Sequence, residues 1–394
     1  MTERAPFRFE GTIPASKSVM IRWLITASYG GALTIDGDSN CDDVRIAKAA
    51  LVALRAGQPI EVGDGAFGFR ALVARASRLP GTHVFQLGHR LAERPHRPLL
   101  EMLADLAVDV AVDGTVWRVS SRGWQLPKAP LFVDGSFSSQ FASALAVNGW
   151  DLPAPLVFHA PSPVSGGYFA LTRRQLGSVG LTVEPLGDDR WRLPAGVAVP
   201  VASVAAEPDM SSAFAVAALA AVAGEAHLQG LGAAVLEQSE QPDRCFPELL
   251  RRYGAAVTVG TEGLRVRRAD APTAFDVDLR GAPDLFPVLA ALLAVAPGRS
   301  RLFGAPQLRA KESDRIAAVA ALLRGVGIAS EPQDDGLVVY GQRPVAAGEA
   351  FLFDPGRDHR LVMAAAVLKR AGLSIEIAGT AVVAKSFPEF APLI

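Results

Sequence analysis

A helix followed by a β-hairpin recurs along this chain. Four segments begin with apolar residues at helical spacing, pass through a glycine or another small residue, and end in two β-rich runs around a tight turn: residues 99–119, 171–193, 246–267 and 319–341. Residues 44–62 show the first half of the same pattern. A repeated unit of this kind cannot bury its apolar face alone, so it packs against its neighbours. The pattern predicts an α/β fold of repeated units rather than simple βαβ winding.

The length and composition favour two globular domains. The chain has 394 residues, about half of them hydrophobic and a fifth charged, which is more than one ordinary core accommodates. Residues 1–11 contain no apolar signal segment, and polar residues interrupt the alanine-rich runs before they reach transmembrane length. We therefore expect a protein that neither is exported nor spans a membrane.

Charge and metal-ligating residues exclude several function classes. The net charge of -1 provides no basic field for nucleic acid or for an anionic membrane, so small molecules are the expected partners. Only Cys41 and Cys245 occur, which favours a reducing compartment, the cytoplasm. The histidines form no metal motif, no GxGxxG follows a strand, and GxxxxGK[ST] is absent. We expect no metal and no cofactor.

Several expected helices begin with cations or with hydroxyl and amide donors. A helix N-terminus carries a partial positive charge, so a cation there lowers stability unless a negative group lies beside it. Each start taken alone is also explained by a solvated charge or an ordinary cap. Together they predict a bound anion. The groups concerned are Lys17, Arg22, Ser138, Ser139, Gln140, Lys311, Arg315, His359 and Arg360, with Lys311 and Arg315 expected in the first turn of one helix.

Six short motifs follow one another over almost the whole chain. They are SKSVMIR, RLAERPHRPLLEML, DGSFSSQF, LRAKESDRI, DHRLVMA and AKSFPEF. In this order they resemble the motifs of the EPSP synthase family of enolpyruvyl transferases. Any one of them is short, but chance does not explain six in the family's order.

The resemblance implies a fold of two similar lobes. Each lobe is expected to contain three βαβαββ repeats, an arrangement described as an inside-out α/β barrel, which agrees with the repeats seen in the sequence. Residues 14–206 are expected to form the first lobe, on the shikimate 3-phosphate side. Residues 1–13 and 207–394 are expected to form the second, which carries the acids and the C-terminal anion-binding residues. The active site is expected in the cleft between them.

The reaction implied by the resemblance belongs to the shikimate pathway of aromatic amino acid biosynthesis. The enolpyruvyl group of phosphoenolpyruvate is transferred to the 5-hydroxyl of shikimate 3-phosphate, and phosphate is released, by addition and then elimination. Lys17, Asp284 and Glu312 match the family's catalytic positions. Local sequence alone favours a helix N-cap for Asp284 and allows Glu312 to be an ion-pair partner of Arg315 three residues on.

The resemblance also assigns the substrate-binding residues. For shikimate 3-phosphate they are Lys17, Ser18, Arg22, Ser138, Ser139, Ser165, Tyr168, Asp284, Gln307 and Lys311. For phosphoenolpyruvate they are Lys17, Ala66, Arg94, Gln140, Arg315, His359, Arg360 and Lys385. Guanidinium groups suit both carboxylates and phosphates, whereas ordinary surface solvation is the alternative explanation for these cations.

One loop departs from the family pattern. Residues 64–70, DGAFGFR, stand where NAGTxxR is usual, so Asp64, Ala66 and Phe67 replace Asn, Gly and Thr. A carboxylate beside two phosphates would oppose their binding, and the Ala66 methyl would crowd a backbone amide. The sequence therefore predicts weakened phosphoenolpyruvate binding.

Two other functions stay open at this point. One is a related carboxyvinyl transfer to another alcohol, such as UDP-N-acetylglucosamine, although neither cysteine lies where that enzyme carries one. The other is a non-catalytic ligand-binding paralogue, which would not need Lys17, Asp284, Glu312, Arg315 and Lys385 together. A monomer is expected in either case.

Overall fold

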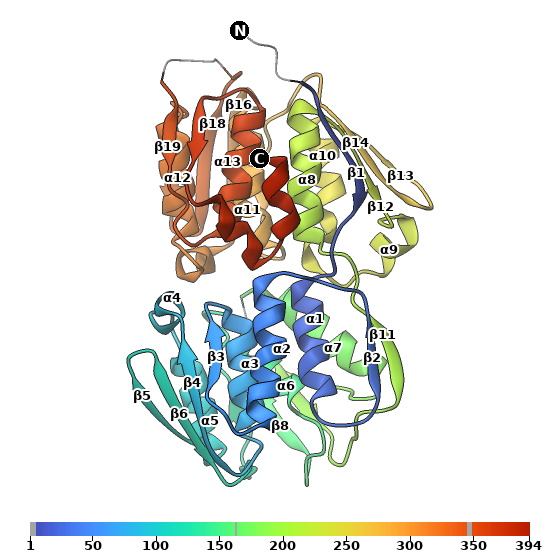
Figure 1. The fold of residues 1–394 in the computed structure, drawn as a ribbon, viewed down its shortest axis with the longest axis vertical. Coiled ribbons are helices and arrows are strands. Elements are labelled where there is room, and N and C mark those ends of the chain that lie inside the picture. Colours follow the sequence, from blue (N-terminus) through green and yellow to red (C-terminus); the bar gives the residue numbers. More distant parts are fainter. Residues whose placement is uncertain (1–4, 162–163, 345–348) are drawn as a thin grey trace. The chain divides into compact units, whose positions relative to one another are not determined.

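The chain forms an α/β structure of two compact units. A computed structural model describes residues 5–161, 164–344 and 349–394 (Figure 1). One unit is Ala15–Ala206, and the other joins the N-terminal segment up to Pro14 to Glu207–Ile394. Mixed α/β architecture was the fold class predicted from the sequence, and it is confirmed. Among the described residues, no helix is long and apolar enough to cross a membrane.

The unit Ala15–Ala206 contains two four-stranded sheets and a parallel pair. The first sheet, in the order β3-β4-β6-β5, contains β3 (Ile60–Gly63), β4 (Gly81–Leu87), β5 (Asp109–Asp113) and β6 (Val116–Ser121). The second, in the order β7-β8-β10-β9, contains β7 (Leu131–Phe132), β8 (Leu156–His159), β9 (Glu184–Gly187) and β10 (Arg190–Leu193). The pair is β2 (Leu33–Asp36) with β11 (Ala202–Ala205). The helices are α1 (Lys17–Ala27), α2 (Asp42–Arg55), α3 (Ala66–Ala76), α4 (His89–Ala92), α5 (Arg97–Asp105), α6 (Gln140–Val147) and α7 (Gly166–Ser178).

The other unit has the same plan. Its first sheet, in the order β1-β12-β14-β13, contains β1 (Phe7–Thr12), β12 (Gly224–Gln229), β13 (Ala256–Val259) and β14 (Gly263–Arg267). Its second, in the order β15-β16-β18-β17, contains β15 (Val277–Asp278), β16 (Gly298–Phe303), β17 (Ser330–Gln333) and β18 (Gly336–Gly341). The parallel pair is β19 (Phe351–Phe353) with β20 (Ile375–Ile377). The α-helices are α8 (Met210–Ala223), α9 (Ala233–Gln238), α10 (Phe246–Tyr253), α11 (Phe286–Ala294), α12 (Arg315–Gly325) and α13 (His359–Arg370). Short 3-10 turns are η1 (Pro242–Cys245), η2 (Pro283–Leu285), η3 (Pro306–Ala310), η4 (Thr380–Lys385) and η5 (Pro388–Leu393).

Helices, not sheets, occupy the centre of each unit. Helices α8, α11 and α13 pack against one another, and every residue of α11 is buried (Figure 1). Residues Met210–Ala221 of α8 are also buried. Helices α3 and α6 take the corresponding place in Ala15–Ala206. These helices are rich in alanine, whose short side chain lets buried helices approach closely, and a helix that is apolar all round belongs in a core.

The predicted repeats are present, but they are not all complete. In each unit, two repeats consist of a parallel strand pair followed by an antiparallel hairpin, as in β3, β4, β5 and β6. The third repeat of each unit is seen only as a parallel pair, β2 with β11 and β19 with β20. The described residues thus contain two full βαβαββ units and one shortened unit in each half.

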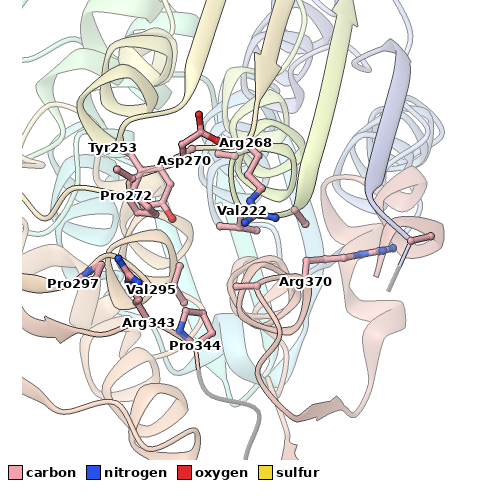
Figure 2. Close-up of a pocket in the computed structure, with 16 residues that line it drawn as sticks. Val222, Tyr253, Arg268, Asp270, Pro272, Val295, Pro297, Arg343, Pro344 and Arg370 are labelled. Atoms are coloured by element: carbon pink, nitrogen blue, oxygen red, sulfur yellow. The ribbon is translucent and has the colours of Figure 1, made fainter. Parts of the chain in front are cut away.

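The central helices of the unit containing Glu207–Ile394 have polar N-terminal ends. Asp209 and Asp358 cap α8 and α13, each accepting a backbone N–H. The opposite ends of α8, α11 and α13 line a pocket of about 560 Å³ (Figure 2). Its wall includes Tyr253, Arg268 and Asp270. The candidate site described next is at the capped ends.

Candidate functional site

Arg315 is the centre of an ionic cluster in the unit containing Glu207–Ile394. It is the first residue of α12, and its side chain is 2% exposed. Its guanidinium meets Asp358 through two nitrogens, Nε to Oδ2 at 2.9 Å and Nη2 to Oδ1 at 3.2 Å. Nη1 donates to Asp284 Oδ1 at 2.9 Å, and Nη2 donates to Glu312 Oε2 at 3.0 Å. One buried cation therefore orients both predicted catalytic acids.

Asp284 receives two further cations. Lys311 Nζ lies 3.6 Å from Asp284 Oδ1, and Arg360 Nη2 lies 3.4 Å from its Oδ2. Burial alone would raise the pKa of Asp284, but Lys311, Arg360 and Arg315 together lower it well below its usual value. Burial likewise opposes the charge of Arg315, whose pKa is nevertheless raised by Asp358, Glu312 and Asp284. Asp284 is therefore a carboxylate at neutral pH.

Lys311 does not lie in the first turn of α12, contrary to the sequence-based expectation. The helix begins four residues later, at Arg315, because Asp314 caps it by accepting the Ala317 N–H at 3.0 Å. Lys311 is extended and follows η3. From this extended position its Nζ approaches Asp284.

The other residues predicted in this unit lie on neighbouring elements. His359 and Arg360 open α13 directly after Asp358, as expected. Gln307 belongs to η3, and Lys385 ends η4. All four are at least nine-tenths buried. Their predicted contacts with substrate stay predictions.

Lys17 is the corresponding cation in the unit Ala15–Ala206. It is the first residue of α1, and its Nζ lies 2.8 Å from Asp43 Oδ2, in the first turn of α2. Ser16 occupies the cap position of α1 but makes no capping hydrogen bond. The carboxylate that compensates this cation at a helix start is thus supplied by α2.

Arg22 is buried, and its guanidinium makes hydrogen bonds within the protein. Its Nε donates to Thr172 Oγ1 at 2.7 Å, and its Nη1 donates to the Ser18 carbonyl at 2.6 Å. The Tyr168 carbonyl accepts from Nη2 at 3.3 Å, and the Phe67 ring lies 4.1 Å from the guanidinium carbon. Burial lowers the pKa of Arg22 to about 9. In this structure Arg22 ties α1 to α7, and its predicted substrate contact stays a prediction.

The SSQ motif opens α6, as the sequence indicates. Gln140 is its first residue, and Ser138 Oγ accepts the Gln140 N–H at 3.2 Å. Ser139 Oγ instead donates to the Ser165 carbonyl at 3.0 Å, which joins the motif to the start of α7. Gln140 Oε1 accepts from Arg70 Nη1 at 2.7 Å. The hydroxyls and the amide predicted to bind phosphate therefore lie on adjoining helix starts.

Asp64, in the altered loop, has a structural role that the sequence analysis did not assign. Its Oδ1 accepts the Leu91 N–H at 3.1 Å, at the start of α4. A Cβ at Gly88 would lie 2.2 Å from Asp64 Oδ1 and 3.0 Å from the Gly63 carbonyl oxygen, so a larger residue there would displace the Asp64 side chain. Ala66 is the first residue of α3 and is buried. Arg94 is partly buried, and its Nε forms no hydrogen bond with any of the described residues.

His96 anchors the segment that carries Arg94. Its Nε2 donates to the Leu91 carbonyl at 2.8 Å, so the ring is the neutral Nε2–H tautomer. Its ring lies edge-on to Phe69 and Trp117, with centroids 5.2 and 5.1 Å away. Burial, then the charge of Arg70, lowers the pKa of His96 to about 4.

The chain is similar to known proteins over most of its length. The family model described as EPSP synthase (3-phosphoshikimate 1-carboxyvinyltransferase) matches residues 31–393. The chain belongs to the EPSP synthase family. A 3-phosphoshikimate 1-carboxyvinyltransferase of Methanocorpusculum labreanum is 34% identical over 86% of this chain and 77% of the relative. One of Syntrophobacter fumaroxidans is 32% identical over 96% of this chain and 94% of the relative.

Solved structures agree with the EPSP synthase fold. EPSP synthase from Acinetobacter baumannii superposes with a TM-score of 0.74 at 22% identity, over 98% of this chain and 95% of that one. The enolpyruvyl transferase NikO from Streptomyces tendae gives 0.73 at 17% identity, over 100% and 94%. At these identities the likeness is one of fold.

Three acidic residues near the candidate site were not predicted from the sequence as site residues. Asp43 pairs with Lys17, Asp358 pairs with Arg315, and the negative charge of Asp284 helps to raise the pKa of buried Asp243. Asp358 was expected only as a cap. Cations at the starts of α1 and α12 provided a signal for the first two, because buried cations need carboxylate partners within the fold itself.

Proposed function

We propose that this protein transfers the enolpyruvyl group of phosphoenolpyruvate to the 5-hydroxyl of shikimate 3-phosphate and releases phosphate. Family membership supports this substrate pair. The observation that carries the chemistry is the arrangement of Asp284 and Glu312 on one guanidinium, that of Arg315. A binding protein that had lost catalysis would not need two acids oriented by one buried cation.

The two steps each need a proton moved. In the addition step, the hydroxyl oxygen forms a bond to the central carbon of phosphoenolpyruvate. The hydroxyl loses a proton, and the methylene carbon gains one. In elimination, the methyl carbon loses a proton and the bond from carbon to the phosphate oxygen breaks. Asp284, ionised under the influence of three cations, receives the hydroxyl proton. Glu312 exchanges the proton at the methylene carbon, and Lys17 assists both steps.

The two units divide the binding work in this proposal. Ala15–Ala206 supplies Lys17, the SSQ motif and Arg94, whereas Glu207–Ile394 supplies the two acids, Lys311, Arg360 and Lys385. Substrates with phosphate and carboxylate groups suit the cations that each unit provides. The protein acts as a monomer in the cytoplasm and needs no cofactor.

A phosphate-release assay tests the proposed function. Phosphoenolpyruvate and shikimate 3-phosphate together should release phosphate, and neither alone should. Replacing shikimate 3-phosphate with UDP-N-acetylglucosamine should abolish release. Turnover only with the sugar nucleotide would assign the chain to the related transfer, and binding of both substrates without turnover would support the non-catalytic alternative.

A further inference from the structure

Asp243 is a buried carboxyl group that the proposed mechanism does not use. It lies in η1, directly before α10, and is 1% exposed. Its Oδ2 accepts a hydrogen bond from Ser211 Oγ, in the first turn of α8. Its Oδ1 is buried, and no group in the described part of the chain forms a hydrogen bond with it. An ionised oxygen in that position would lose its hydration and gain nothing in return, whereas an uncharged carbonyl oxygen costs much less.

The groups that face Asp243 come from three other elements. Asp284 of η2 and Asp209, the cap of α8, add negative charge, and Arg360 of α13 adds positive charge. Cys245 follows in η1, and its own pKa is raised to about 11 by burial and by Asp243. Burial, then Asp284, raises the pKa of Asp243 to about 7, against the effects of Arg360 and Ser211. The pKa of Asp284 is shifted the opposite way, because Lys311, Arg360 and Arg315 outweigh its burial.

Two neighbouring carboxyl groups thus have opposite protonation tendencies. Asp284 makes ion pairs with Lys311, Arg315 and Arg360. Among the residues that the structure describes, the one hydrogen-bond partner of the Asp243 side chain is the neutral hydroxyl of Ser211. Such a pair titrates as a unit, with one proton held by the less solvated and less paired group.

We propose that Asp243 is a positioning residue that holds one proton, so that its carboxyl group does not compete with an anionic substrate for the guanidinium of Arg360. Protonated Asp243 fixes Ser211 at the start of α8 and places no negative charge beside Arg360. When Asp243 ionises, its charge competes with the substrate's phosphate or carboxylate for that guanidinium. Binding of the substrate anion to Arg360 therefore favours protonation of Asp243, and protonation of Asp243 favours binding of the anion. This inference rests on the proposed function for the identity of the substrate, but not for the protonation of Asp243.

Thermal unfolding tests the protonation without any substrate. A carboxyl group whose pKa is higher in the folded than in the unfolded state stabilises the fold at low pH, and this contribution is lost as pH rises toward 7. Asp243→Asn keeps the shape and the hydrogen bond to Ser211 but cannot ionise. The wild type should lose stability relative to this variant between pH 5 and pH 8. A constant difference in melting temperature over that range would refute a proton on Asp243.

Binding of phosphoenolpyruvate tests the consequence for Arg360. The dissociation constants of wild type and Asp243→Asn should agree at pH 6, and the wild type should become weaker by on the order of tenfold at pH 8.5, which is the effect of about one pKa unit of charge interaction. Ionisation of the ligand affects both proteins equally and cancels. Ser211→Ala serves as the control for a purely structural role. It removes the hydrogen bond but leaves the carboxyl group, so binding should still depend on pH, with a midpoint at higher pH than in the wild type, because Ser211 lowers the pKa of Asp243.

The outcomes separate the two proposals. If the unfolding difference varies with pH but wild type and variant bind phosphoenolpyruvate with the same pH profile, then Asp243 holds a proton that does not influence Arg360, and the inference is wrong. If no variant or wild type binds phosphoenolpyruvate at all, the proposed function fails as well. A variant weakened equally at every pH would make Asp243 a structural residue only.

Discussion

At the scale of single residues, the most informative side chain is Arg315. Its three carboxylate partners are Asp284, Glu312 and Asp358. Only the contact with Glu312, three residues away, could be predicted from local sequence spacing. From the sequence, anions of the substrate are expected beside the cations at helix starts. In the structure, carboxylates of the protein already occupy these places beside Lys17 and Arg315. A folded chain without ligand must compensate its own buried charges first.

Replacing either acid on Arg315 should impair catalysis more than binding. Asp284→Asn and Glu312→Gln keep the shape of each side chain but remove its proton-transfer group, so turnover should fall by on the order of a hundredfold or more. Asp314→Asn is the matched control, because Asp314 lies two residues from Glu312 and caps α12, and Asn is also a good cap. Steady-state kinetics with both substrates checks this. Lost binding with unchanged turnover at saturation would assign the residue a structural role.

Ala66 should reduce inhibition by glyphosate, the phosphonate that competes with phosphoenolpyruvate in this family. Its methyl group lies at the first position of α3, and overpacking there costs about 1 to 3 kcal/mol for a ligand slightly longer than the substrate. The Ala66→Gly variant should therefore bind glyphosate more tightly than the wild type, by roughly tenfold or more, at equal saturation with phosphoenolpyruvate. Ala71→Gly, in the buried interior of the same helix, controls for general destabilisation. Strong inhibition of the wild type would show that the methyl points into the core.

At the scale of elements, the sequence predicts correctly the helices and strands whose signals lie within one short segment. Pairings between distant segments are not predicted. The hairpins after α5, α7, α10 and α12 lie within segments that carry their own helix, glycine and turn signals, and they are all present. The shortened third repeats were not anticipated, because β2 and β11 pair across more than 160 residues. The expected start of α12, which included Lys311, is wrong, because the Asp314 cap makes the helix begin at Arg315. The burial of Arg22 depends on Tyr168 and Thr172, far away in the sequence.

The segment between α4 and α5 should be sensitive to acid through His96. Its pKa is about 4 in the fold and about 6.5 when unfolded, so the unfolded state binds more protons between these values and stability falls as pH falls. Between pH 7 and pH 4.5 the loss should be on the order of 2 kcal/mol. His96→Gln keeps a donor for the Leu91 carbonyl but does not titrate. The wild type should lose stability relative to this variant, as measured by urea unfolding at both values, and parallel losses would contradict a buried neutral ring.

At the scale of the whole molecule, the proposed division of binding groups between two units predicts a response to ligand. Shikimate 3-phosphate should reduce the radius of gyration measured by small-angle scattering, because an anion held by cations of both units brings them together. Shikimate without the phosphate should not have this effect at equal occupancy. An unchanged radius at saturation, with binding confirmed by a thermal shift, would contradict closure.

The pairing of β1 with β12 also determines the order in which this protein can be completed during translation. Strand β1 is made first, but its parallel partner begins at Gly224, after the whole of Ala15–Ala206. At 5 to 20 residues per second the ribosome needs roughly 10 to 40 s to reach that point. The inserted unit can fold in that interval, while the N-terminal strand waits with its backbone hydrogen-bonding groups unpaired. We therefore expect this strand to be the part of the nascent chain most in need of a chaperone.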